Sequence, residues 1–474
     1  MFDTTNTITP LVTVGDLGGY GDVIAGVNLL QTLDREGMEP QTHFDTEAKE
    51  KFEEVAPREL QDQVDTWLET DDDERLVAIT PVRDKRSHQQ RKKSDIHLSI
   101  EEYDDTDRDI ERSRYDDRIT VRTGLGFEES IADVQAGIYR DEEIDELLDD
   151  IETAFDTEAV IQDYRQDVLD EVLADVETEA SDYLDEEELV DGRWSFLYKS
   201  SVGSMETFFD IVEEAENELD DELYLFTASG DGRAMDAARD RGWDGYRLTE
   251  RELAPWEEGK EPVTEAEDSP VTVIEMGTIP NSQFKRMNVL ADSLSLVTGD
   301  HSYSQAMQQA QSEVAAPFLY QCANWKKDLA GNMVQYMEET DEEAAALFSE
   351  YIAESRSMSA FRTDKDVEDL ARLFYDEELQ ERYNEAVAQV KDGFVRDREE
   401  AGIEEAERLW SVNETVQYIV DHVEQEETAS ETYQPLLPDE DRVEDPPLPV
   451  YAETVQEEVA GRLKKAKDYL TELV

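Results

Sequence analysis

The sequence is poor in cysteine, in basic residues and in long apolar runs, and each shortage excludes a class of protein. Cys322 is the only cysteine among 474 residues, which excludes an internal disulfide and a cysteine-based metal cluster. The five histidines show neither HxxxH nor HExxH spacing, so they carry no metal-binding signature. No apolar run approaches the roughly 18 residues of a membrane-spanning helix, and the N-terminal MFDTTNT lacks a signal pattern. The sequence therefore predicts a cytoplasmic protein with no membrane span.

Basic residues are outnumbered throughout: 44 Lys and Arg stand against 121 Asp and Glu, for a net charge of −77 and a pI near 4.1. The acid is spread through every segment rather than gathered in a tail. This favours adaptation to a salt-rich cytoplasm over an acidic surface made for one basic partner. We therefore expect a halophilic, archaeal type of protein. Acidic runs such as Asp141 to Asp150 are interpreted as solvated helix faces.

The chain is long enough for two or three domains. Its first apolar run, Leu11 to Val14, predicts a buried strand, followed by the Gly-rich turn GDLGGYGD and a helix with Val23, Val27, Leu30 and Leu33 on one side. The turn is neither a Walker A loop nor a GxGxxG fingerprint. It indicates only that backbone comes close to a ligand or another segment. Further predicted elements are strands at 75–82 and 117–122, a helix at 47–54, and acidic helices through most of 128–190.

One basic segment stands out in this first part. Arg83 to Lys93, RDKRSHQQRKK, holds six Lys or Arg in eleven residues. It could hold an anionic acceptor or a phosphate, or it could be a loop that relieves the repulsion of nearby acid. It has no interleaved aromatic residues, which disfavours nucleic acid as a partner.

A second series of strands and helices begins at Trp194. The apolar runs predict six strands separated by helices, near 194, 223–227, 245–249, 271–276, 294–297 and 317–320. This alternation is typical of a doubly wound parallel sheet, in which ligands bind at the turns outside the carboxyl ends of the strands. Two polar turns, SVGSM at 201–205 and TGDHSYS at 298–304, each lead into a helix start that would suit a phosphate. The alternative is that Ser302 or Ser304 merely caps its helix.

Beyond residue 324 the pattern is helical, with helices predicted at 325–338, 341–355, 365–390 and 402–424. A Pro-rich acidic linker follows, and a final helix near 455–473 carries an apolar stripe that predicts packing back onto the first domain. We therefore divide the chain into an N-terminal Rossmann-like acceptor domain at 1–190, a second Rossmann-like domain at 191–340, and a helical extension at 341–474.

These features resemble the GT-B fold of nucleotide-sugar-dependent glycosyltransferases, in which two Rossmann-like domains face each other across a cleft. The local similarity is to the elongation-factor arginine rhamnosyltransferases and the heptosyltransferases. It lies in Gly21-Asp22, in Gly299 to Ser302 with Ala306, and in Pro317-Phe318. The resemblance implies a candidate base in the first motif and a donor diphosphate held by the second. The sequence departs from that pattern by two extra residues between Asp16 and Gly21-Asp22.

Inverting sugar transfer needs a carboxylate to deprotonate the acceptor and a group that neutralises the leaving diphosphate. A helix terminus can do the second without a metal, so neither a metal nor a permanently bound cofactor is expected. Asp22 is the preferred base, with Asp16 and Asp300 as alternatives. Asp22 could instead cap its helix, and Asp300 could cap its own or hold the acceptor or a ribose. The candidate donor ligands lie in the two turns of the second domain, apart from Lys199, which precedes the SVGSM turn; they are Lys199, Ser201, Ser204, Gly299, Ser302, Tyr303 and Ser304. A nucleotide-sugar 2-epimerase and a non-catalytic binding protein remain alternatives.

Overall fold

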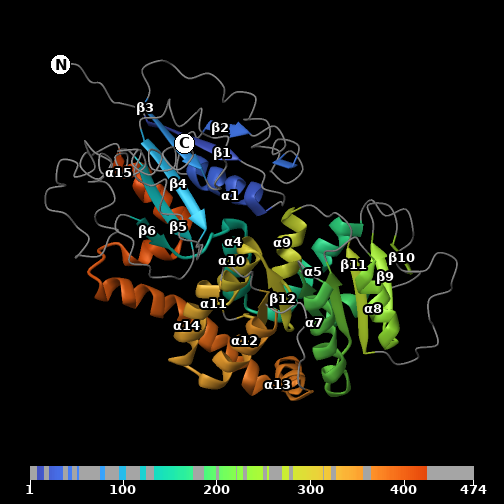
Figure 1. Cartoon of the computed structure of the whole chain (residues 1–474). Helices are drawn as coiled ribbons and strands as arrows, with labels where there is room; N and C mark the ends of the chain where they lie inside the picture. The colour runs from blue at the N-terminus through green and yellow to red at the C-terminus, as the bar shows by residue number, and fades with distance from the viewer. Residues whose placement is uncertain are drawn as a thin grey trace, which may run out of the picture.

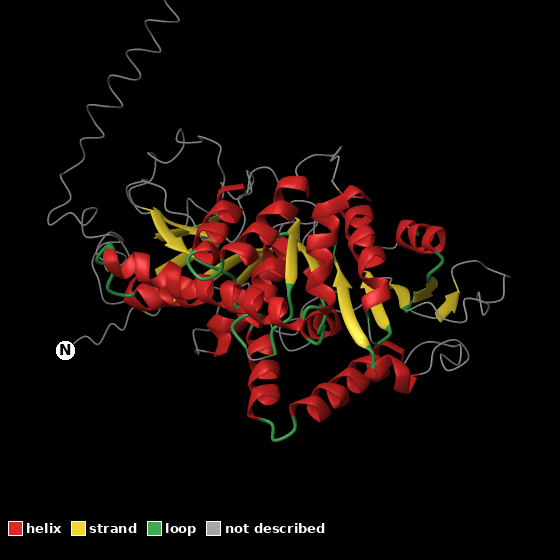
Figure 2. Cartoon of the chain, turned by 90° about the horizontal axis from the view of Figure 1, so that it is seen from below, coloured by secondary structure: helices red, strands yellow, loops and turns green. Residues whose placement is uncertain are grey.

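The computed structural model describes residues 8–14, 21–35, 41–44, 51–52, 75–80, 96–102, 118–123, 133–173, 186–198, 202–219, 221–227, 232–248, 253–255, 270–276, 281–312, 314–321, 327–355 and 364–423. Within them the chain forms two α/β units, each built on its own sheet (Figure 1). In Figure 2 the strands lie among the helices that cover them.

The first sheet has six strands, and all its neighbouring strands are parallel, in the order β2-β1-β3-β4-β5-β6. The strands are β1 Ile8–Val14, β2 Gln41–Phe44, β3 Arg75–Thr80, β4 Ile96–Glu102, β5 Arg118–Thr123 and β6 Asp133–Ala136. Helix α1, Gly21–Arg35, follows β1 and buries the predicted face of Val23, Val27, Leu30 and Leu33. Because β2 and β3 lie on opposite sides of β1, the strand order reverses at β1. Such a switch point is where ligands bind in open α/β sheets.

The second sheet has seven strands in the order β10-β9-β11-β8-β7-β12-β13. They are β7 Arg193–Leu197, β8 Leu223–Thr227, β9 Asp244–Leu248, β10 Leu253–Pro255, β11 Val271–Met276, β12 Ser295–Thr298 and β13 Phe318–Gln321. Six are parallel and are the six expected from the sequence, whereas β10 is antiparallel to β9. Every residue of β8 and β11 is buried because helices cover both faces. Here the order reverses between β7 and β12.

Helices cover each face of the second sheet with a separate apolar cluster. One face carries α4 Glu142–Thr153, α5 Thr157–Leu173, α6 Glu186–Asp191 and α9 Asn281–Val289, which pack on aromatic residues of β7 and β8 such as Trp194 and Phe226. The other carries α7 Val202–Ala215, α8 Arg233–Arg241 and α10 Asp300–Gln309. The predicted boundary at residue 190 thus separates α4 and α5 from the sheet that they cover, and it falls inside α6. An amphipathic pattern shows that a helix has an apolar face, but not which sheet receives it.

The C-terminal helices pack on the second unit and then return to the first. They are α11 Lys327–Glu338, α12 Glu342–Ser355, α13 Asp364–Tyr375, α14 Glu377–Glu400, the short 3-10 helix η6 Ala406–Trp410, and α15 Val412–Val423. The single helix predicted at 365–390 is two helices, because Asp376 breaks the run and caps α14. Helix α15 lies against α1 and β5, beside the blue and cyan strands of Figure 1. The return is therefore made by α15, while the predicted returning helix near 455–473 lies outside the described residues.

The structure confirms the predicted fold class of two Rossmann-like doubly wound sheets with a helical C-terminal extension. The predicted helix at 47–54 lies outside the described residues, apart from residues 51 and 52. None of the helices described here is both long enough and apolar enough to span a membrane.

Candidate functional site

The first candidate half-site follows β1 at the switch point of the first sheet. Helix α1 begins at Gly21, so Asp22 is its second residue. Asp16 and the rest of the Gly-rich turn lie outside the described residues, as does the basic segment Arg83 to Lys93, which follows β3 in the chain. The strands that precede these two segments in the sequence, β1 and β3, are neighbours in the sheet.

The second half-site follows two neighbouring strands of the second sheet. Strands β7 and β12 pair through Leu197 and Leu296, and the Tyr198 N–H donates to the Leu296 carbonyl at 2.8 Å. Helix α7 starts after β7, and α10 starts directly after β12. The two predicted turns therefore follow neighbouring strands at one switch point, while residues 199–201, with Lys199 and Ser201, lie outside the described residues.

Helix α10 starts in a way that only glycine allows easily. Its N-cap, Gly299, has φ +79° and ψ 168°, a region that is essentially restricted to glycine. A Cβ atom built at Gly299 would meet no atom within 4 Å, and the residue is exposed. No described side chain caps this helix. The backbone N–H groups of the first turn therefore have no side-chain cap among the described residues, and they carry the partial positive charge of the helix dipole.

The start of α8, in the same sheet, is arranged differently. Its N-cap, Gly232, also has a positive φ of 75°, but its N–H donates to the carboxylate of Glu275 at 2.9 Å. Glu275 is fully buried and comes from β11. A protein carboxylate thus occupies the start of α8, whereas among the described residues none occupies the start of α10.

The hydroxyl groups predicted to hold the diphosphate have partners inside the protein. The Ser302 hydroxyl is buried and donates to the Thr298 carbonyl, one turn earlier. Ser304 accepts a hydrogen bond from the Tyr139 N–H at 3.1 Å. Neither serine caps α10, since its N-cap is Gly299. The ligand roles of both serines stay predictions.

Tyr303 and Ser204 are also buried. The Tyr303 ring packs on Tyr320 with ring centroids 4.8 Å apart, and its hydroxyl lies 3.6 Å from the sulfur of Met333. Tyr303 therefore belongs to the core between α10 and β13. Ser204 lies in the first turn of α7. Asp300 is the first residue of α10 and follows the N-cap Gly299, so it is not the N-cap itself, and its roles as base or ligand stay predictions.

Helix α1 of the first unit contacts the segment that leads into α4 of the second. The Asn28 side-chain amide lies 3.3 Å from the Asp141 carboxylate, and that of Gln31 lies 3.5 Å from Glu143. The residue numbers of these contacts increase together, from 28 to 31 on α1 and from 141 to 143 in the other segment. Helix α1 therefore runs in the same direction as this segment.

Helix α10 contacts the same segment in the same order. Ser304 bonds to Tyr139, and the Gln308 side chain exchanges hydrogen bonds with the Asp141 backbone at 2.7 and 3.0 Å. Helices α1 and α10 also contact each other. Because both helices run along residues 139–143 in the same direction, their N-terminal ends lie on the same side. The starts of α1 and α10, which belong to the two predicted half-sites, therefore face the same side.

A buried ion pair that no local sequence pattern indicates lies at this junction. Asp141 and Lys285 are both buried, with the Lys285 ammonium 2.6 Å from the Asp141 carboxylate and 3.3 Å from that of Glu143. The interpretation of Asp141 to Asp150 as a solvated face is therefore wrong for Asp141, which caps α4 by accepting from the Glu143 N–H at 3.2 Å. Burial also raises the pKa of Asp145, against the opposing effects of Gln308 and Arg140. An aspartate directly before an apolar helical pattern is a capping signal that could have identified Asp141.

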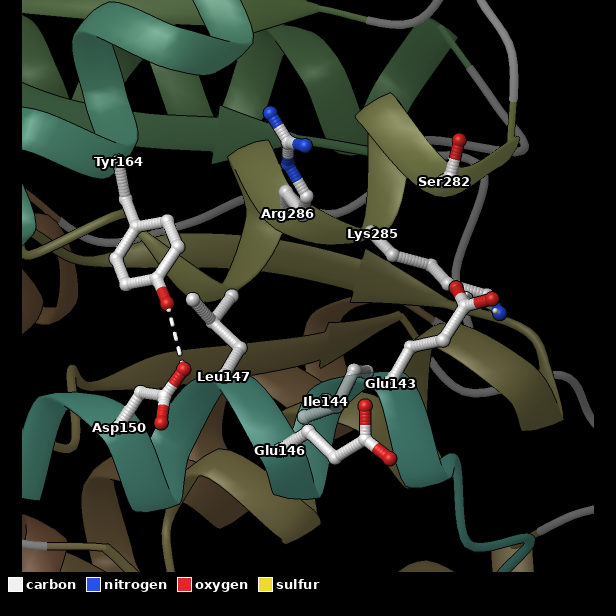
Figure 3. A pocket seen from close by; sticks show the side chains of 9 residues that line it. All are labelled: Glu143, Ile144, Glu146, Leu147, Asp150, Tyr164, Ser282, Lys285 and Arg286. Atoms are coloured by element: carbon white, nitrogen blue, oxygen red, sulfur yellow. Dashed lines mark hydrogen bonds and ion pairs between the residues drawn. The ribbon is translucent and has the colours of Figure 1, made fainter.

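A cavity of about 310 Å³ lies between α4, α5 and α9 (Figure 3). It is lined by Glu143, Ile144, Glu146, Leu147, Asp150, Tyr164, Ser282, Lys285 and Arg286. Several of its charged groups are already paired: the Tyr164 hydroxyl donates to Asp150 at 2.8 Å, and Arg286 bonds to Glu171 at 3.0 Å. Within the described part of the chain, no three His, Cys, Asp or Glu side chains gather in a metal-binding group.

The chain is similar to several solved structures. An S. aureus MnaA–UDP co-structure is 14% identical with a TM-score of 0.38, covering 84% of this chain and 96% of that chain. A putative UDP-N-acetylglucosamine 2-epimerase from Listeria monocytogenes is 12% identical with a TM-score of 0.37 and the same coverage. AviGT4, a glycosyltransferase involved in avilamycin A biosynthesis, is 9% identical with a TM-score of 0.31, covering 82% and 96%. No protein-family model and no curated protein sequence matches the chain.

Proposed function

We propose that this protein is a glycosyltransferase that transfers a sugar from a nucleotide-sugar donor to an acceptor in the cytoplasm of a halophilic archaeon. One observation carries the proposal. Each sheet has a switch point followed by a turn singled out from the sequence, and α1 and α10 direct these two sites to the same side. A donor on the second unit and an acceptor on the first would then meet between the helix starts.

The donor diphosphate is proposed to lie at the start of α10. Gly299 gives it open space, and the first-turn N–H groups supply donors and a favourable dipole. Because the single proton of Ser302 is already donated to Thr298, the backbone contributes more than this hydroxyl. Lys199 and Ser201, in the turn after β7, complete the proposed ligand set on the neighbouring strand. No metal and no bound cofactor is part of the proposal.

The acceptor is proposed to approach from the first unit, where Asp22 acts as general base. A carboxylate at a helix start is stabilised in its charged form, so Asp22 would be ionised at neutral pH. Its low basicity would be offset by its proximity to the nucleophile. Asp16 and Asp300 are the alternative bases. The basic segment Arg83 to Lys93 would suit an anionic acceptor.

Calorimetry in molar KCl against a panel of nucleoside diphosphates tests donor binding first. Assays of sugar transfer with the nucleotide sugar so identified then compare the wild type with Asp22→Asn. The variant should bind nucleotide normally and turn over about 10²- to 10⁴-fold more slowly. Asp34→Asn, near the other end of α1, is the matched control and should change neither property.

Each alternative predicts a different result. An epimerase would convert the sugar of the donor without any acceptor. A non-catalytic protein that has lost the donor site would bind no nucleoside diphosphate. Full activity of Asp22→Asn would move the base to Asp16 or Asp300.

A further inference from the structure

The two units are joined by two chain segments that lie side by side. Residues 137–141 lead from the first sheet into α4, and residues 409–413 lead from η6 back into α15. The Gly137 N–H donates to the Leu409 carbonyl at 2.6 Å, and the Val412 N–H to the Ile138 carbonyl at 2.9 Å. A Cβ atom at Gly137 would lie 2.4 Å from a Trp410 backbone oxygen. Only glycine allows the two crossings to approach so closely.

Asp141, at the end of the first crossing, is fixed on the side of the second unit. Its carboxylate lies 2.6 Å from the ammonium of Lys285 on α9, and its backbone N–H and carbonyl both bond to the side chain of Gln308 on α10. Asp141 and Lys285 are both buried. Removing one partner of such a pair would leave an uncompensated charge in the interior.

The contacts from α1 to the same region are longer or more exposed. Asn28 lies 3.3 Å from Asp141, and its own side-chain oxygen is buried without a partner among the described residues. The nearest distance between Arg35 and Glu146 is 3.8 Å, and their side chains are 43% and 74% exposed. Exposed pairs of this kind contribute little to stability. The polar contacts at the crossing are therefore shorter and more buried than those made along α1.

We propose that Asp141 is a positioning residue: clamped by Lys285, it fixes the orientation of the first unit on the second and thereby the position of the α1 start relative to the α10 start. This inference concerns the junction and does not depend on the proposed reaction. If the proposed function is correct, the same clamp sets the distance between base and donor.

Distances between spin labels on α1 and α8 measure the orientation of the first unit relative to the second. One label replaces Asp34 on α1 and the other replaces Asp240 on α8, in a background where the native Cys322 is changed to serine. In molar KCl, Lys285→Met should broaden the α1–α8 distance distribution or add a longer population. A second label pair, at Glu214 on α7 and Asp240 on α8, lies within the second unit and should keep its distribution.

Arg286→Met is the matched control, because Arg286 is the next residue on α9 but pairs with Glu171 inside the second unit. It should leave the α1–α8 distribution unchanged. If Lys285→Met fails to fold, Asp141→Asn/Lys285→Met removes both charges and should fold with the broadened distribution. An unchanged distribution in the folded variants would overturn the proposal, and so would equal broadening in Arg286→Met or within the second unit.

Nucleotide calorimetry on the same variants separates this inference from the proposed function. Lys285→Met should retain nucleoside diphosphate binding, because the start of α10 is not altered. If the wild type binds no nucleotide, the proposed donor site fails while the distance measurement still tests the clamp.

Discussion

The starts of helices α14 and α10 differ in how their first backbone N–H groups are satisfied. Helix α14 is capped by Asp376, whose carboxylate accepts from the Leu379 N–H at 3.2 Å and bonds to Arg372 at 2.8 Å. Helix α10 is preceded by Gly299 and has no side-chain cap from the described residues. The first arrangement satisfies the helix end within the protein. The second has no described side chain to accept from its first N–H groups at a sheet switch point, an arrangement that suits an anionic ligand.

Removing the salt should have the largest effect on this comparison, because both helix starts exist only in the folded protein. A net charge of −77 repels itself when the Debye length grows from roughly 3 Å at 1 M salt to about 10 Å at 0.1 M. Circular dichroism should therefore show loss of structure as KCl falls below the molar range. A signal that stays flat down to dilute buffer would contradict the halophilic interpretation.

Removing the cap of α14 should lower stability and leave nucleotide binding unchanged. Asp376→Ala loses the N-cap and should lower the free energy of unfolding by about 0.5–2 kcal/mol, measured by denaturation in molar KCl. Asp376→Asn keeps a capping oxygen and is expected to cost less. Both variants should bind nucleoside diphosphates as the wild type does. Weakened nucleotide binding in either would show that the two helix starts are not independent.

The smallest expected effect is a loss of protein stability in acid that arises from the carboxyl groups at the capped start of α14. Hydrogen bonds from Arg372 hold the pKa values of Glu343 and Asp376 below their usual range. A carboxyl group with a depressed pKa contributes stability above its unfolded pKa, about 4, and loses that contribution as the pH falls through its folded pKa. Because the Glu343 side chain is 43% exposed and that of Asp376 is 30% exposed, each should contribute about 0.2–1 kcal/mol, and less in high salt. Denaturation of Glu343→Gln should show a weaker loss of stability below pH ~4 than the wild type. An identical pH dependence would exclude this contribution.

Most elements of the second unit were predictable because their apolar runs are buried on both faces. LYLFT of β8 and VTVIEM of β11 are examples. Strands β2, β4, β6 and β10 were missed, since QTHF, IHLSIEE, DVQA and LAP are short or polar and their strand character depends on pairing with neighbours.

The candidate site was predictable only in part. The two polar turns of the second unit were singled out because they follow apolar strands, and those strands, β7 and β12, are neighbours in the sheet. The clamp between Asp141 and Lys285 joins residues 144 positions apart and leaves no local pattern. The partner of the Ser302 hydroxyl was equally hidden, because a serine near a helix start can cap, bond back to a carbonyl or bind a ligand.

The most direct test of the proposed donor site compares two glycines that share a positive φ. Gly299 and Gly242 both have φ +79°, and a Cβ atom at either would meet nothing within 4 Å, but Gly242 ends α8 whereas Gly299 starts α10. Alanine at Gly242 should cost about 1–2 kcal/mol of stability and leave nucleotide affinity unchanged. Gly299→Ala should shift the turn and weaken nucleoside diphosphate binding in molar KCl by tenfold or more, which corresponds to about 1.4 kcal/mol. Equal affinities in the two variants, or no binding by the wild type, would contradict a diphosphate site at the start of α10.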